Sequence, residues 1–105
     1  MANTFQRAVN ANIGVTLEAV HTATAKTVVI GLTLANVTGG SITASVQLAT
    51  AGEDPYIIKN IPIPSGSSVE IMGGNKIVMD SGDILNVSGS AATSVDATMS
   101  YMEIT

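Results

Sequence analysis

Apolar and polar side chains alternate along most of this 105-residue chain, in short segments separated by turns. Residues 41–48 show the pattern, because every second side chain there is apolar. A period of two is typical of a strand with one buried face and one face in water. Gly, Ser and Pro clusters mark the chain reversals. Eight segments are predicted as strands of an all-β sandwich or barrel: 15–22, 27–37, 42–50, 55–61, 68–72, 76–79, 84–90 and 95–104.

Two of these segments carry apolar residues on both faces. Residues 27–37 are predicted as a central strand, with Val28, Ile30, Leu32 and Leu34 on one face and Val29, Gly31, Thr33 and Ala35 on the other. In the last segment the inward residues are expected to be Val95, Ala97, Met99 and Tyr101, after which Met102 and Ile104 reverse the sense. Such a switch indicates a bulge or a contact with another subunit.

Two prolines limit where the segment around residues 61–64 can lie. Pro62 and Pro64 cannot donate ladder hydrogen bonds. This stretch is therefore predicted to be an edge strand or a connection between sheets.

The first 14 residues differ from the remainder. Phe5, Val9 and Ile13 are isolated apolar residues, spaced by four, among Asn, Gln and Arg. That spacing fits one face of a short helix, but an isolated helix this short is marginal in water. We predict an irregular arm or an edge strand over 1–14, followed by a sandwich domain over 15–105.

Composition excludes several classes of function. Charged residues make up 11% of the chain and the net charge is −4, so the few scattered cations offer no phosphate-binding patch for nucleic acid. No apolar run approaches the roughly 20 residues of a membrane-spanning helix, and the start lacks the order of a signal peptide. The expectation is a soluble protein made in the cytoplasm, with no cysteine and hence no thiolate chemistry.

Candidate catalytic and metal sites are few. His21 is the only histidine. The sequence contains no Gly-x-Ser-x-Gly motif that would supply a nucleophilic serine for it, so a surface or hydrogen-bonded role is favoured. Asp80 and Asp83 flank a turn but supply too few oxygens for calcium, and are expected to accept backbone N–H bonds there. No phosphate-binding glycine motif is present. We expect no enzyme activity and no cofactor or metal.

Four stretches carry a resemblance to a known group of proteins. They are 22–36 (TATAKTVVIGLTLAN), 61–68 (IPIPSGSS), 79–87 (MDSGDILNV) and 100–105 (SYMEIT). They resemble small virion proteins of tailed bacteriophages. The resemblance covers residues 15 to the end and implies a single jelly-roll-like sandwich of about eight antiparallel strands.

Such proteins decorate and cement capsids or serve as tail adaptor, fibre or baseplate parts. The resemblance therefore implies a capsid decoration protein in the virion, with the major capsid protein as partner, no nucleic acid and no membrane contact. A homo-oligomer is expected, with a trimer favoured. A tail component is the alternative, and a free carbohydrate-binding or hydrolytic domain is a third reading. The expected interaction residues are Phe5, Arg7, Val9, Ile13, Met102 and Ile104.

Overall fold

The computed structural model describes residues 3–104, which form nine β-strands and no helix. The all-β prediction is confirmed. The strands are β1 (Asn3–Ile13), β2 (Glu18–Thr22), β3 (Lys26–Asn36), β4 (Ile42–Ala49), β5 (Tyr56–Ile63), β6 (Ser68–Glu70), β7 (Ile77–Met79), β8 (Ile84–Gly89) and β9 (Val95–Ile104).

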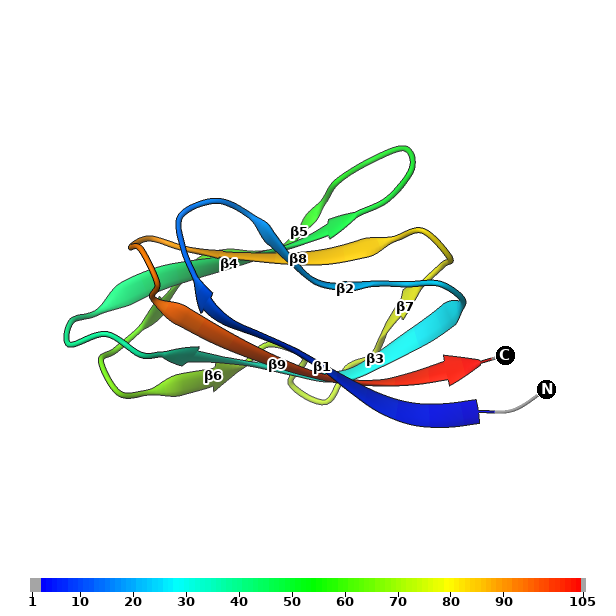
Figure 1. Cartoon of the computed structure of the whole chain (residues 1–105), viewed down its shortest axis with the longest axis horizontal. Helices are drawn as coiled ribbons and strands as arrows, with labels where there is room; N and C mark the ends of the chain where they lie inside the picture. Colours follow the sequence, from blue (N-terminus) through cyan, green and yellow to red (C-terminus); the bar gives the residue numbers. More distant parts are fainter. Residues whose placement is uncertain (1–2, 105) are drawn as a thin grey trace.

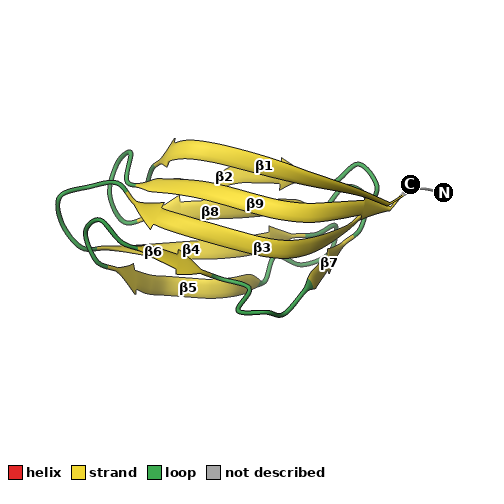
Figure 2. Ribbon diagram, turned by 90° about the horizontal axis from the view of Figure 1, so that it is seen from below, coloured by secondary structure: helices red, strands yellow, loops and turns green. Residues whose placement is uncertain are grey.

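The strands form two stacked antiparallel sheets (Figures 1 and 2). Sheet A has the order β1-β9-β3-β6, with β7 beside β6 on the same edge of β3, and sheet B has the order β2-β8-β4-β5. The pairings nest: β1 with β9, β2 with β8, β3 with β6 and β7, and β4 with β5. The chain is thus one long hairpin rolled over itself, which is a jelly roll in which β6 and β7 act as one interrupted strand.

The segment expected as an arm or an edge strand is an edge strand. Residues Asn3 to Asn10 pair in continuous register with Ile104 to Ala97 of β9. A bulge follows, where Asn12 has a positive φ of 59° and its backbone N–H donates to Asp96 Oδ1 at 2.8 Å. β1 is therefore the first strand of the jelly roll, not a unit separate from the sandwich.

β3 is central, as predicted, but the expected assignment of its faces was wrong in its first half. A bulge at Ile30 shifts the register between Val29 and Gly31. Because the bulge adds one residue, Val29 faces inward with Leu32 and Leu34, whereas Val28 and Ile30 face outward.

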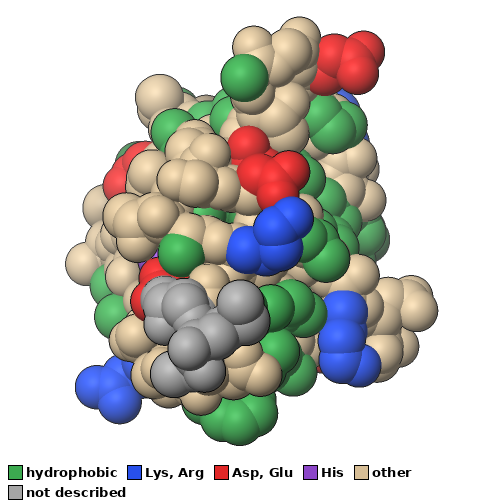
Figure 3. Space-filling model, turned by 90° about the vertical axis from the view of Figure 1, so that its right-hand side faces the viewer, with side chains coloured by type: hydrophobic (Ala, Val, Ile, Leu, Met, Phe, Trp, Pro, Cys, Tyr) green, Lys and Arg blue, Asp and Glu red, His purple; other side chains and the backbone are tan. Residues whose placement is uncertain are grey.

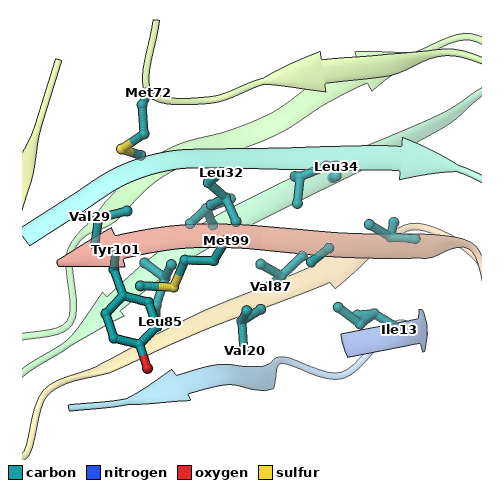
Figure 4. Close-up of a cluster of buried hydrophobic side chains, with 14 of the residues drawn as sticks. Ile13, Val20, Val29, Leu32, Leu34, Met72, Leu85, Val87, Met99 and Tyr101 are labelled. Atoms are coloured by element: carbon teal, nitrogen blue, oxygen red, sulfur yellow. The ribbon is translucent and has the colours of Figure 1, made fainter. Parts of the chain in front are cut away.

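The core lies between the sheets (Figure 4) and is contributed by every strand except β6. β9 supplies its middle, with Val95, Ala97, Met99 and Tyr101 inward as predicted. Met102 and Ile104 simply continue the alternation and face outward, because β9 pairs without a bulge to β1 up to Ile104. Met102 and Ile104 therefore make the outer face of β9 apolar, and the strand has no irregularity at this point.

The proline-rich stretch belongs to an edge. β5 pairs only with β4 among the described strands, and Pro62 lies opposite Thr43. The prediction of an edge strand is confirmed for Pro62, while Pro64 follows the strand.

Gly89, the last residue of β8, is required by packing. A Cβ there would overlap Ser94 Oγ and come within 2.9 Å of Val95 Cγ2, and both of those residues are fully buried. We expect Gly89→Ala to lower the free energy of unfolding by about 2 kcal/mol, because overpacking forces the backbone apart. Urea denaturation measures this change. Gly39→Ala is the control, since nothing lies within 4 Å of a Cβ at that position, and an equal loss in both variants would contradict the steric explanation.

Candidate interaction surface

The outer face of sheet A carries an unusual number of apolar side chains. Of the large hydrophobic side chains that remain exposed among residues 3–104, four belong to this face: Phe5 (75% exposed), Val9 (63%), Val78 (55%) and Ile30 (37%). Figure 2 looks onto this face, and in Figure 3 hydrophobic side chains reach the lower border of the molecule on the same side. Exposed patches of this kind mark surfaces that contact other proteins.

Strand register arranges these side chains in rows that run across the sheet. One row is entirely apolar, because Phe5 pairs with Met102, Met102 with Val28, and Val28 with Val78. The row crosses four strands, β1, β9, β3 and β7. It lies at the end of the sandwich where both termini are found (Figure 1).

The neighbouring row is polar, and its small side chains leave a depression in the surface. Arg7 pairs with Ser100, and Ser100 with Gly31, so the middle of this row carries only small side chains. A depression of about 680 Å³ opens there, lined by Phe5, Gln6, Arg7, Ile30, Ser100 and Tyr101. Arg7 makes no ion pair within residues 3–104, where the one salt bridge joins Lys26 to Asp80 at 2.8 Å.

Glu70 lies on the opposite edge of the sheet, where it pairs with Thr33 in the next row, but its side chain reaches back toward Gly31. Its carboxylate accepts the backbone N–H groups of Leu32 (2.9 Å) and Met72 (3.2 Å) and the hydroxyl of Thr33 (3.0 Å). Both carboxylate oxygens lie 3.8 Å from where a Cβ on Gly31 would be. Glu70 therefore satisfies the Leu32 amide, which lies opposite the interruption between β6 and β7, and places a negative charge across the sheet from Arg7.

These hydrogen bonds set the ionisation of Glu70. Partial burial raises the pKa of the carboxyl, but the bonds from Leu32, Thr33 and Met72 outweigh it, so the pKa lies below its ordinary value. A lowered folded-state pKa gives stability that is present above the unfolded-state pKa and is lost as the pH falls through the folded-state value.

We therefore expect Glu70→Gln to remove part of the acid sensitivity of folding. At neutral pH the variant should be less stable than the wild type, because a neutral amide is the weaker acceptor. The difference should shrink as the pH falls below about 4.5, where the unfolded carboxyl begins to protonate. Thermal melts across this pH range provide the measurement, and a difference that stays constant with pH would contradict the assignment.

The outer face of sheet B is polar by comparison. Its central row consists of Ala19, Asn86, Gln47 and, at the β5 edge, Tyr56, and the side-chain amides of Asn86 and Gln47 lie 3.5 Å apart. Thr43 and Ser88 continue the polar character along β4 and β8. The two outer faces therefore differ in kind, and sheet A presents the apolar one.

The structure brings five of the six expected interaction residues to one face. Phe5, Arg7 and Val9 of β1 and Met102 and Ile104 of β9 all face outward on sheet A. Ile13 does not, and the expectation for it was wrong: it is 0% exposed in the core, because the bulge before it turns its side chain inward.

Four residues of the surface were missed by sequence reasoning: Val28, Ile30, Val78 and Glu70. Alternation alone would have found Val78, since the inward neighbour Met79 is fully buried. Val28 and Ile30 depend on the bulge, which leaves no mark in the pattern of apolar residues.

His21 lies at the margin of the core, not in a reactive cluster. Its ring is 4.3 Å from that of Tyr101, tilted by 31°, and its Nε2 is buried without a hydrogen-bond partner in the described part of the chain. Burial lowers the pKa of His21, and the nearby charge of Glu103 opposes that effect. Burial raises the pKa of Tyr101, and Glu103 adds to it. The imidazole ring of His21 therefore packs against the side chain of Tyr101.

The remaining candidate groups have structural roles. Asp83 Oδ2 accepts the backbone N–H of Asp80 at 2.9 Å, as predicted, whereas the Asp80 carboxylate pairs with Lys26 instead of the backbone. Residues 3–104 contain no group of three or more His, Cys, Asp or Glu side chains placed to hold a metal ion. They also contain no helix long and apolar enough to cross a membrane.

Comparison with known proteins gives a likeness of fold only. No protein family and no curated protein matches the sequence. A solved structure described as "Bacillus endospore appendages form a novel family of disulfide-linked pili" superposes with a TM-score of 0.60 at 13% identity, covering 96% of this chain and 87% of that one. The likeness supports the β-sandwich architecture over nearly the whole length of the chain.

Proposed function

We propose that this protein is a non-enzymatic structural subunit of a virion, and in particular a capsid decoration protein that stabilises the head shell. The observation that carries the proposal is the outer face of sheet A, where exposed apolar side chains surround a depression. A surface of this kind contributes binding energy through buried apolar area and needs no reactive group.

Three further features support a structural role. The jelly roll is a fold used by viral capsid domains, although a fold alone does not fix a function. The four sequence stretches that resemble phage virion proteins extend over β3, β5, β7, β8 and β9. Finally, His21 packs against Tyr101, Asp83 accepts a backbone N–H in its turn and Asp80 pairs with Lys26, so these three candidates need no catalytic role to account for them.

Protein analysis of purified virus particles tests this proposal. For the virus whose genome encodes the chain, mass spectrometry should find the protein in intact particles at a copy number comparable with that of the major capsid protein. A few copies per particle would indicate a tail component instead. Absence from particles would overturn the virion proposal.

A second candidate is a subunit of a pilus-like fibre. The superposition over 96% of this chain favours it, because the matched structure is described as forming pili. Those pili are described as disulfide-linked, whereas this sequence contains no cysteine, so a fibre of this chain would need non-covalent joints. Electron microscopy of the purified protein separates the candidates: filaments without any other component favour the fibre.

A further inference from the structure

The outer face of sheet A is complementary to itself about one two-fold axis, and we propose that a second copy of this chain covers it. The inference rests on the proposed function, since it names the partner of the same surface. The axis lies between two stacked faces and runs parallel to the strands, between β9 and β3. Rotation about it places β1 of one copy over β6 and β7 of the other, and β9 over β3.

The apolar row matches itself under this rotation. Because the rows run across the strands, each row falls on the same row of the other copy in reversed order. Phe5 then lies opposite Val78, and Met102 lies opposite Val28. By symmetry both contacts occur twice, so all four side chains of the row in each copy are covered by apolar partners.

The charges select this axis over its alternative. In the neighbouring row Arg7 lies over the β6 edge of the other copy. There the Glu70 carboxylate reaches from its register position opposite Thr33 back to Gly31 of that row. An axis perpendicular to the strands would instead place β1 over β1 and β6 over β6, and an axis through the Arg7 row would set Arg7 against Arg7. Because like charges facing each other weaken an interface, the charge pattern favours the axis parallel to the strands.

The shape of the outer face of sheet A fits the same two-fold axis. Ser100 of β9 lines the depression, and the exposed bulge residue Ile30 of β3 lines it on the other side. The rotation brings β3 over β9, so Ile30 of each copy enters the depression of the other. Stacking of two sheets face to face about 10 Å apart, with their strands nearly aligned, is the ordinary geometry of sheet packing.

Complementary charge variants test the pairing. Sedimentation velocity should show the wild type as a concentration-dependent dimer. Arg7→Glu places Glu against Glu70, and Glu70→Lys places Lys against Arg7, so each variant alone should dissociate about 100-fold more readily. An equal mixture of the two should form a heterodimer within about tenfold of wild-type affinity, because both contacts are again of opposite charge. Lys59→Glu, at an exposed position of β5, makes the same change of net charge as Arg7→Glu and should leave the dimer intact.

A wild type that is monomeric at every concentration, a trimer, or a mixture that fails to associate would overturn the two-fold pair. Because Glu70 also accepts the backbone N–H groups of Leu32 and Met72, a second experiment leaves it unchanged. Ser100→Cys introduces one thiol close to the axis in a chain without cysteine. A short bis-maleimide should join two such chains efficiently, and should not join Ala19→Cys, which places its thiol on the outer face of sheet B. Equal yields from both variants would also overturn the pair.

The pair and the proposed function fail separately. Loss of the dimer in solution while the wild type is present in purified particles would remove the pair and leave the virion role. A dimer of a protein that is absent from particles would do the reverse.

Discussion

Asn36→Ala should lower the free energy of unfolding by about 3 kcal/mol. The Asn36 side chain is 3% exposed and makes four hydrogen bonds. Its amide donates to the carbonyls of Gly40 (2.8 Å) and Ile63 (2.9 Å), and its oxygen accepts the N–H (2.8 Å) and hydroxyl (2.7 Å) of Thr38. Removing the side chain leaves the buried Ile63 carbonyl and the Thr38 N–H without partners, and each such group costs about 1–3 kcal/mol.

Urea denaturation of the wild type and the variant gives this difference. Asn75→Ala is the matched control, because Asn75 is exposed in a turn and contributes only its backbone N–H, to the carbonyl of Met72 at 2.9 Å. The control should stay within about 0.5 kcal/mol of the wild type. A loss below about 1 kcal/mol for Asn36→Ala would show that the network does not hold the β3–β4 turn to the end of β5.

Met99→Ala should cost a similar amount, about 3 kcal/mol, through a different cause. Met99 is 0% exposed in the middle of β9 and lies between the two sheets (Figure 4). β1 and β3 flank it on either side, with Ala8 and Leu32 in register. Truncation in such a place loses the buried apolar area and leaves a cavity that the paired strands cannot collapse to fill.

The matched control lies one residue away. Thr98 occupies the same strand but faces outward and is exposed, so Thr98→Ala should change stability by no more than about 0.5 kcal/mol. Thermal unfolding of both variants provides the comparison. Equal losses would mean that the inward and outward faces of β9 have been exchanged.

The sequence predicts most strands because half-buried strands of a sandwich leave a period of two in the chain. All eight expected segments contain a strand in the structure, and the inward set of β9 is correct to the residue. The ninth strand, β1, was open between an arm and an edge strand, because its polar inward residues Gln6 and Asn10 hide the alternation. Only pairing with β9 distinguishes the two.

Bulges limit how well the alternation of apolar and polar residues predicts the face on which a side chain lies. One inserted residue exchanges the faces of everything after it. Ile13 was therefore assigned to the interaction surface, and Val28 and Ile30 to the same face as Leu32 and Leu34. Neither bulge is marked by glycine at its inserted residue. Asn36 shows a second limit: residues 36–38 match a glycosylation sequon, yet the side chain of Asn36 is buried in hydrogen bonds.

The interaction surface was half predictable for the same reason. Phe5, Arg7 and Val9 were chosen as exposed apolar and charged residues of the first segment, and Met102 and Ile104 because they departed from the inward set. That β1 and β9 are neighbours, so that these residues share one face, follows from pairing between the two ends of the chain. No local pattern encodes a contact of that sequence separation.

Occupancy on purified particles, measured for two arginine variants, tests the central claim most directly. Phe5→Arg places a charge in the apolar row of sheet A, and Ala19→Arg places the same charge on the exposed outer face of sheet B. Both should fold with melting temperatures near that of the wild type. If the protein assembles through the outer face of sheet A, Phe5→Arg is lost from particles while Ala19→Arg is retained at wild-type occupancy. Equal occupancy of the two variants would contradict the claim.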